Sequence, residues 1–118
     1  MEYLALIHAD QSVWETMTDV ERDAAYEQYG EFADAARGAG VLVGGEELAS
    51  TASATTVRVR DEQRVVTDGP YAEVKEALGG FFILDCASFE DALDWAARIP
   101  AVHHGAVEVR PLHVDPEA

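Results

Sequence analysis

The chain has 118 residues, 48% of them hydrophobic and 26% charged, which is typical of one small globular domain and unlike a disordered segment. Its formal net charge of −15 at pH 7 repels phosphate backbones and anionic lipid head groups, so nucleic acids and membrane surfaces are poor partners. The single cysteine, Cys86, excludes an intrachain disulfide bond. The first residues carry no basic stretch followed by a long apolar run, so we expect a cytoplasmic protein without a signal peptide or membrane span.

The first third of the chain predicts a strand, a loop and a helix. Residues 3–8 form a short apolar run that is typical of a buried strand, and the polar residues 10–17 predict a loop. Thr18 and Glu21 have the spacing of a capping box, so a helix is expected to begin there. Apolar residues spaced by four and three define the face of this helix that we expect in the core: Ala25, Tyr29, Phe32, Ala36 and Ala39.

Glycines are expected to end this helix and to shape the next strand. Gly38 and Gly40 accept the left-handed backbone geometry that closes a helix. Residues 41–43 predict a strand, and the glycine pair 44–45 predicts a bulge or a close approach of two backbones. The small residues 48–54 predict a loop.

The second half of the chain begins with a predicted β-hairpin. Residues 55–60 alternate and are β-branched, residues 61–63 are typical of a turn, and residues 64–67 resume the strand pattern. After a break, the strongly apolar residues 81–86 predict a further strand.

A second helix and a last strand are predicted near the end of the chain. Ser88 is expected to cap this helix, with Asp91 in the answering position, and Pro100 is expected to end it. Residues 106–112 predict the last strand. The apolar stripe of the helix comprises Phe89, Ala92, Leu93, Ala96 and Ile99.

This order of elements predicts a single α+β domain over residues 1–118. It is of the ferredoxin-like type: two β-α-β units joined by a hairpin, with an antiparallel sheet and two helices on one face. The strand at 81–86 is apolar on both faces, because Phe81 and Ile83 point one way while Phe82 and Leu84 point the other. Two helices cover only one face, so we expect a second copy of the chain to cover the other in a homodimer.

The segment from Asp68 to Glu76 reads Asp-Gly-Pro-Tyr-Ala-Glu-Val-Lys-Glu and resembles the signature of the DGPF family, a branch of the YCII-related proteins. The family's run reads roughly Asp-Gly-Pro-Phe-Ala-Glu-Thr-Lys-Glu. Residues 40–46, 54–58 and 105–111 also match, so the likeness covers nearly the whole chain. The resemblance implies a ferredoxin-like fold and a dimer of the α+β barrel type, with clefts between two packed sheets.

The same resemblance implies a site but says little about function. Relatives in the wider group carry a histidine on the first helix, paired with an aspartate that Asp68 matches, and the two are proposed as an acid/base pair. In this chain Tyr29 falls near the position of that histidine. Tyr71 stands for the family phenylalanine, and Val74 for its threonine. Some family members are encoded beside extracytoplasmic-function sigma factors, which implies an association with sigma-factor-dependent transcription.

The residues of this signature are open to two interpretations. Asp68 precedes a Gly-Pro pair, where a carboxylate commonly bonds its own downstream N–H groups, or it is a general base at the mouth of a cleft. Glu73 and Lys75 are either solvated charges or cleft residues, with Lys75 anchoring an anion and Glu73 accepting a proton. Tyr71 and Tyr29 complete the expected ligand contacts.

A second group of candidate residues lies on the first and last strands of the predicted sheet. His8 ends the first strand and is either structural or, with a carboxylate such as Asp68 or Glu108, an acid/base. Glu108 and Arg110 face away from the helices because side chains alternate along a strand. They form either an intersubunit salt bridge or a site in which Arg110 binds a ligand carboxylate.

No metal or cofactor is expected. His103 and His104 are adjacent and point opposite ways in an extended segment, so they do not make a metal site together. The sequence contains no phosphate-binding loop, Cys-x-x-Cys pair or nucleophile elbow.

Two functions are therefore open, and both use the intersubunit cleft. The first is a homodimer that binds a small molecule or regulates a partner. The alternative is a cofactor-independent enzyme acting on a small organic acid or aromatic, with Asp68 as base, His8 as acid, and Lys75 or Arg110 as the anion anchor. In a third interpretation the Asp-Gly-Pro segment only builds a dimer contact.

Overall fold

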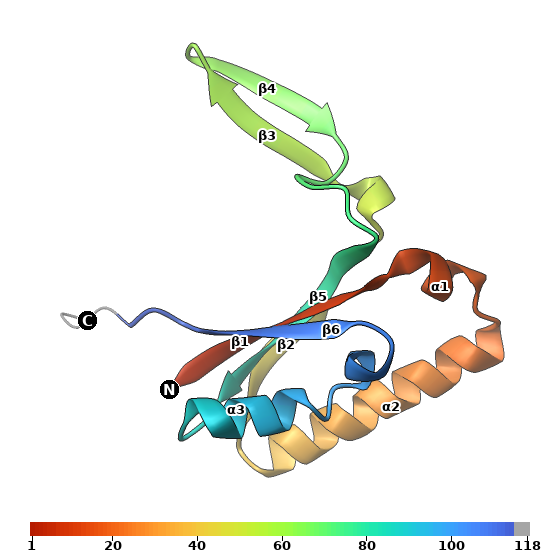
Figure 1. The fold of residues 1–118 in the computed structure, drawn as a ribbon, viewed down its shortest axis with the longest axis vertical. Helices are drawn as coiled ribbons and strands as arrows, with labels where there is room; N and C mark the ends of the chain where they lie inside the picture. The colour runs from red at the N-terminus through yellow and green to blue at the C-terminus, as the bar shows by residue number, and fades with distance from the viewer. Residues whose placement is uncertain (115–118) are drawn as a thin grey trace.

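The computed structural model describes residues 1–114 and is α+β (Figure 1). Four strands form an antiparallel sheet in the order β2-β5-β1-β6, and β3 and β4 form a separate hairpin that projects from it. The last residues of the predicted domain, 115–118, lie outside the described residues. The helices and strands are β1 (Glu2–Asp10), α1 (Gln11–Thr16), α2 (Asp19–Gly38), β2 (Leu42–Glu47), β3 (Thr55–Arg60), β4 (Gln63–Asp68), β5 (Glu76–Asp85), α3 (Phe89–Ala96) and β6 (Ala106–Pro111).

The hydrophobic core lies between one face of the sheet and the helices α2 and α3, which both lie on that side (Figure 1). Sheet side chains alternate, so every second residue of the central strands β1 and β5 points into this core. The buried cluster consists of Tyr3, Ala5, Phe32, Ala36, Leu84, Cys86, Ala92, Ala96, Ile99 and Ala101. Val107 and Val109 of β6 pack against it, as the alternation predicts.

Helix α2 begins and ends where the sequence predicts. The Glu21 amide donates to Thr18 Oγ1 at 3.2 Å, and the Thr18 amide donates to Glu21 Oε1 at 3.1 Å, so the capping box is formed. Beyond its last residue, Gly40 takes a left-handed φ of 74°. Phe32 and Ala36 of the predicted apolar face are buried.

The prediction of a loop over residues 10–17 is wrong, because this segment contains helix α1. Asp10 caps it, accepting from the Ser12 amide at 3.0 Å. The last carbonyls of α1 are bonded by Arg22 of α2, a contact between separate elements that the polar composition of the segment does not reveal.

Strand β5 begins at Glu76, five residues before the predicted start at Phe81. The added residues pair with the end of β1, where Ala9 lies opposite Ala77. They include two glycines, which are poor strand formers in isolation, so the sheet extends here by pairing and not by local preference.

The glycine pair of β2 has both predicted features. The register shifts between Leu42 and Gly44, which is a bulge. At Gly45 the backbone of β5 comes close, since a Cβ atom there would lie 2.6 Å from the Phe81 carbonyl oxygen.

The second predicted helix begins where the sequence predicts but is shorter than expected. The Asp91 amide donates to Ser88 Oγ at 3.1 Å, so Ser88 is the N-cap of α3. The helix ends at Ala96, so Ile99 lies beyond it, and Pro100 begins a short 3₁₀ turn. Ile99 is nevertheless fully buried, as the apolar stripe predicts.

Candidate functional site

The face of the sheet that points away from α2 and α3 is apolar at its centre. Leu6 lies opposite Phe81, and Leu4 lies opposite Ile83 in the pairing of β1 with β5. Residues directly opposite each other in an antiparallel pair share a face, so these four side chains form one patch, which we call the open face. Each of them is only partly buried.

His8, Glu108 and Arg110 lie together beside this patch. His8 Nε2 is 3.6 Å from Glu108 Oε1, and Arg110 Nε donates to Glu108 Oε2 at 2.8 Å. The hydrogen bond from Arg110 holds the pKa of the Glu108 carboxyl below its ordinary value, and His8 adds to the effect. The ion pair predicted between subunits thus forms within one chain, and Glu108 is the carboxylate partner of His8 there.

The structure does not bring Asp68 to His8. Asp68 ends β4 in the projecting hairpin, where it pairs with Thr55, whereas His8 lies on the four-stranded sheet. Over residues 1–114 no hydrogen bond or ion pair joins the two side chains, and the Asp68 carboxylate accepts no hydrogen bond from the amides that follow it. A contact between Asp68 and His8 therefore requires a second copy of the chain and stays a prediction.

The rest of the signature forms the connection between the hairpin and β5. Gly69 takes a φ of 107°, which favours glycine, and its amide donates to the Ala54 carbonyl oxygen at 2.8 Å. Tyr71 is 80% exposed, with the Arg58 guanidinium 5.3 Å from its ring centre. Lys75 contributes to lowering the pKa of the Asp10 carboxyl, after the larger effect of hydrogen bonds from Ser12.

A deep cleft lies on the other side of the sheet, within one chain. It has a volume of about 740 Å³ and is bounded by α1, the first half of α2, the sheet and the residues that follow β2. We call it the α1–α2 cleft. Its apolar and aromatic lining includes Ile7, Trp14, Met17, Tyr26, Tyr29 and Phe82. A concave, largely apolar site with a few polar groups is the usual form of a small-molecule site.

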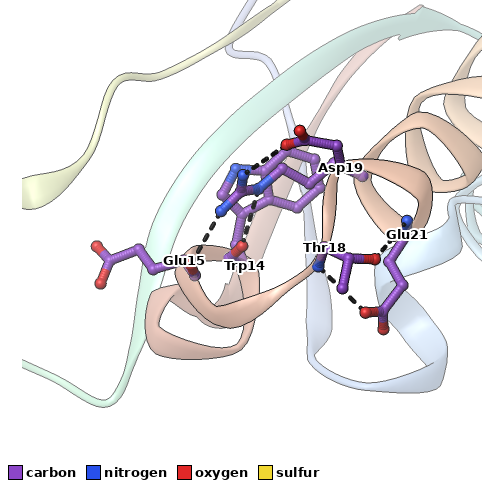
Figure 2. Close-up of polar contacts among 6 residues, drawn as sticks. Trp14, Glu15, Thr18, Asp19 and Glu21 are labelled. Atoms are coloured by element: carbon purple, nitrogen blue, oxygen red, sulfur yellow. Dashed lines mark hydrogen bonds and ion pairs between the residues drawn. The ribbon is translucent and has the colours of Figure 1, made fainter.

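Arg22 of α2 bonds the end of α1, a helix that lines this cleft. Figure 2 labels three residues that Arg22 contacts: Trp14, Glu15 and Asp19. Its guanidinium donates to the Trp14 carbonyl oxygen at 3.2 Å and to the Glu15 carbonyl oxygen at 2.9 Å, and it lies 3.6 Å from Asp19. The last carbonyls of a helix have no partner within it, so a cation that bonds them fixes the helix end. Arg22 thus positions the helix that carries Trp14.

Two tyrosines and one carboxylate form a connected polar group in the cleft. The Tyr26 hydroxyl donates to Glu47, with its oxygen 3.1 Å from each carboxylate oxygen. Burial raises the pKa of both Tyr26 and Tyr29. The hydrogen bond to Glu47 and its charge raise the pKa of Tyr26 further, against a smaller opposing effect of Arg22, and the charge of Glu47 also raises the pKa of Tyr29. The ring of Trp14 meets the ring of Tyr26 edge-on, with centres 5.1 Å apart.

Of the residues predicted to contact a ligand, Tyr29 lines this cleft. The cleft residues Trp14, Tyr26 and Glu47 were missed. One signal could have found Tyr26, which lies three residues before Tyr29 and therefore on a neighbouring position of the same helix surface. Glu47 comes from β2, so only the pairing of the strands brings it to the helix.

Comparison with known proteins finds a family model and a relative that each match almost the entire chain. A family model for the YCII-related domain matches residues 1–114. An uncharacterized protein of Rhizobium meliloti (strain 1021) is 39% identical over 121 residues, which cover 95% of this chain and 92% of that protein. No helix in the described part of the chain is long and apolar enough to cross a membrane. The chain belongs to the YCII-related domain family.

Proposed function

We propose that this protein binds a small, largely apolar molecule in the α1–α2 cleft. The single observation that supports this is the cleft itself: about 740 Å³ of space, lined by aromatic and aliphatic side chains around a Tyr–Glu hydrogen bond. A cleft of that size holds a molecule of ordinary metabolite dimensions. The site differs from the one expected from sequence, which lay between two subunits.

The binding protein is, in this proposal, a ferredoxin-like homodimer of the α+β barrel type that works in the cytoplasm. The strand order β2-β5-β1-β6, with one helix after β1 and one after β5, supports the ferredoxin-like part. The apolar open face supports the dimer, because each 100 Å² of apolar surface removed from water contributes about 2.5 kcal/mol. An association with sigma-factor-dependent transcription stays a prediction that rests on the resemblance alone.

A cofactor-independent enzyme is the second candidate, and one observation favours it. The His8–Glu108–Arg110 group combines an imidazole, a carboxylate and a guanidinium beside the open face. In a dimer, Asp68 of a second copy would be the base, His8 the acid and Arg110 the anchor for a substrate carboxylate, with Lys75, Tyr71 and Glu73 near it.

The test is to map binding of a neutral aromatic probe, 2-naphthalenemethanol, by NMR chemical-shift changes. We expect changes centred on Trp14, Tyr26 and Tyr29. Ala25→Phe, which fills the cleft, should abolish them. Ala33→Phe is the matched control, because Ala33 also lies on α2 but does not line the cleft.

Two results would contradict the proposal. If Ala25→Phe binds the probe as well as the wild type does, the cleft is not the site. If the chemical-shift changes centre on His8 and Arg110 instead, the ligand binds on the open face. That result would contradict the cleft as the site and support the enzyme candidate.

A further inference from the structure

The charged residues that line the α1–α2 cleft are all of one sign. Five carboxylates line it, and within the described residues no lysine or arginine does; His104 is its single basic group. An anionic ligand would face these carboxylates, which outnumber the two cations near them: Arg22, whose charge reaches Tyr26, and Lys75, whose charge reaches Asp10. The lining carboxylates are Asp10, Glu15, Glu21, Glu46 and Glu47.

The five carboxylates differ in what they already bond. Glu21 accepts from the Thr18 amide in the capping box. Asp10 accepts from Ser12, and Lys75 is near enough to it to lower its pKa. Asp10 and Glu21 are thus engaged in helix capping, whereas the other three lining carboxylates, Glu15, Glu46 and Glu47, are not.

Glu47 is the carboxylate placed to meet a ligand beside aromatic rings. The one hydrogen bond it accepts, among residues 1–114, comes from the Tyr26 hydroxyl, so acceptor capacity is left on both oxygens. Its charge reaches Tyr29 as well, since it contributes to the raised pKa of that hydroxyl. Tyr26, Tyr29 and Trp14 line the same cleft, and the faces of aromatic rings attract cations.

We infer that the ligand of this cleft is an apolar amine that binds as its ammonium ion, an inference that rests on the proposed function. The ammonium group binds Glu47 beside the two tyrosine rings. The hydrocarbon part of the ligand lies against Trp14 and Phe82. A charge-assisted hydrogen bond and a cation–π contact both require the positive charge, so a neutral isostere loses both.

The net charge of −15 attracts any cation weakly. The experiment must therefore separate the contribution of Glu47 from that of the net charge, which we call the general field. Salt screens charges that are farther apart than the Debye length, about 8 Å at physiological ionic strength, more than it screens two charges in direct contact. Glu31 provides the matched control, because it is an exposed carboxylate of α2 outside the cleft and its removal changes the net charge equally.

The test compares three probes of one shape by calorimetry at pH 7 and physiological salt: 2-naphthylmethylammonium, 2-naphthalenemethanol and 2-naphthoate. We expect the ammonium probe to bind at least tenfold more tightly than the alcohol, and 2-naphthoate to bind most weakly. Glu47→Gln keeps a hydrogen-bond acceptor for Tyr26 and removes the charge, so it should reduce the preference for ammonium over alcohol to less than threefold. Glu31→Gln should leave the preference unchanged.

The possible failures are distinguishable. If the alcohol and 2-naphthoate bind as tightly as the ammonium probe, the inferred ligand class is wrong while the cleft remains a binding site. If Glu31→Gln reduces the preference as much as Glu47→Gln does, the general field explains it and the inference fails. If none of the three probes binds, the proposed function fails as well. Should Glu47→Gln not fold, the salt dependence of the ammonium preference on the wild type decides: a preference that disappears at high salt would overturn the inference.

Discussion

Single residues in this chain matter most where two backbones come close. Gly45 of β2 has no room for a side chain, since an added Cβ would lie 2.6 Å from the Phe81 carbonyl oxygen and equally near a Phe82 ring carbon. Gly30, within α2, has nothing within 4 Å of the same position. Replacement by alanine therefore places a Cβ atom in a crowded position at Gly45 and in open space at Gly30.

We expect Gly45→Ala and Gly30→Ala to change stability in opposite directions. Gly45→Ala forces the strands apart and should lower the free energy of unfolding by about 1–3 kcal/mol. Gly30→Ala removes backbone freedom from the unfolded chain and should raise the free energy of unfolding by about 0.5–1 kcal/mol. Urea denaturation of both variants measures the shifts. An unchanged free energy of unfolding for Gly45→Ala would contradict the close approach of β2 and β5 at this position.

At the scale of elements, local signals were predictable and contacts between elements were not. The capping box of α2 and the cap of α3 lie within a few consecutive residues, so the sequence alone predicts them. Helix α1 was predicted as a loop because Arg22, which bonds its last carbonyls, comes from the next helix. The early start of β5 at Glu76 depends in the same way on pairing with β1.

Replacing Arg22 should therefore loosen α1 specifically. We expect Arg22→Met to lower the free energy of unfolding by about 1–2 kcal/mol, because two carbonyls lose a charged donor. Hydrogen exchange should accelerate over Gln11–Thr16 and stay slow in the centre of α2. Arg37→Met is the matched control, since Arg37 is exposed and, among residues 1–114, forms an ion pair only with Asp34 in the preceding turn. Its effect should stay within about 0.5 kcal/mol. Equal exchange rates at α1 in the two variants would exclude Arg22 as its anchor.

At the scale of the whole molecule, the sequence singled out several residues that the structure places in the cleft or on the open face, but not all of their groupings. Tyr29 was predicted and lines the cleft, and His8 and Glu108 were predicted and are in contact. Asp68 was predicted, with Glu108, as a carboxylate that could partner His8, yet it ends β4 of the hairpin, outside the four-stranded sheet that carries His8. Which residues meet depends on strand pairing and on the direction of the hairpin, and neither is encoded in the spacing of residues along the chain.

The apolar open face leads to the last prediction, that the protein is a dimer with this face buried. Leu6 lies at its centre, opposite Phe81 on one side and Glu108 on the other. Leu6→Asp adds a charge that a buried interface cannot solvate, so we expect light scattering to give a dimeric mass for the wild type and a monomeric mass for the variant. Circular dichroism should show the same secondary structure in both.

Val20→Asp controls for the added charge, because Val20 is 79% exposed at the start of α2. This variant should remain a dimer. Both copies carry a net charge of −15, so repulsion between them opposes association, and added salt should strengthen the wild-type dimer. A monomeric wild type, or a Leu6→Asp variant that keeps the dimeric mass, would remove the open face as the interface. The Asp68–His8 contact across subunits would then lose its basis, while the α1–α2 cleft, which lies within one chain, would be unaffected.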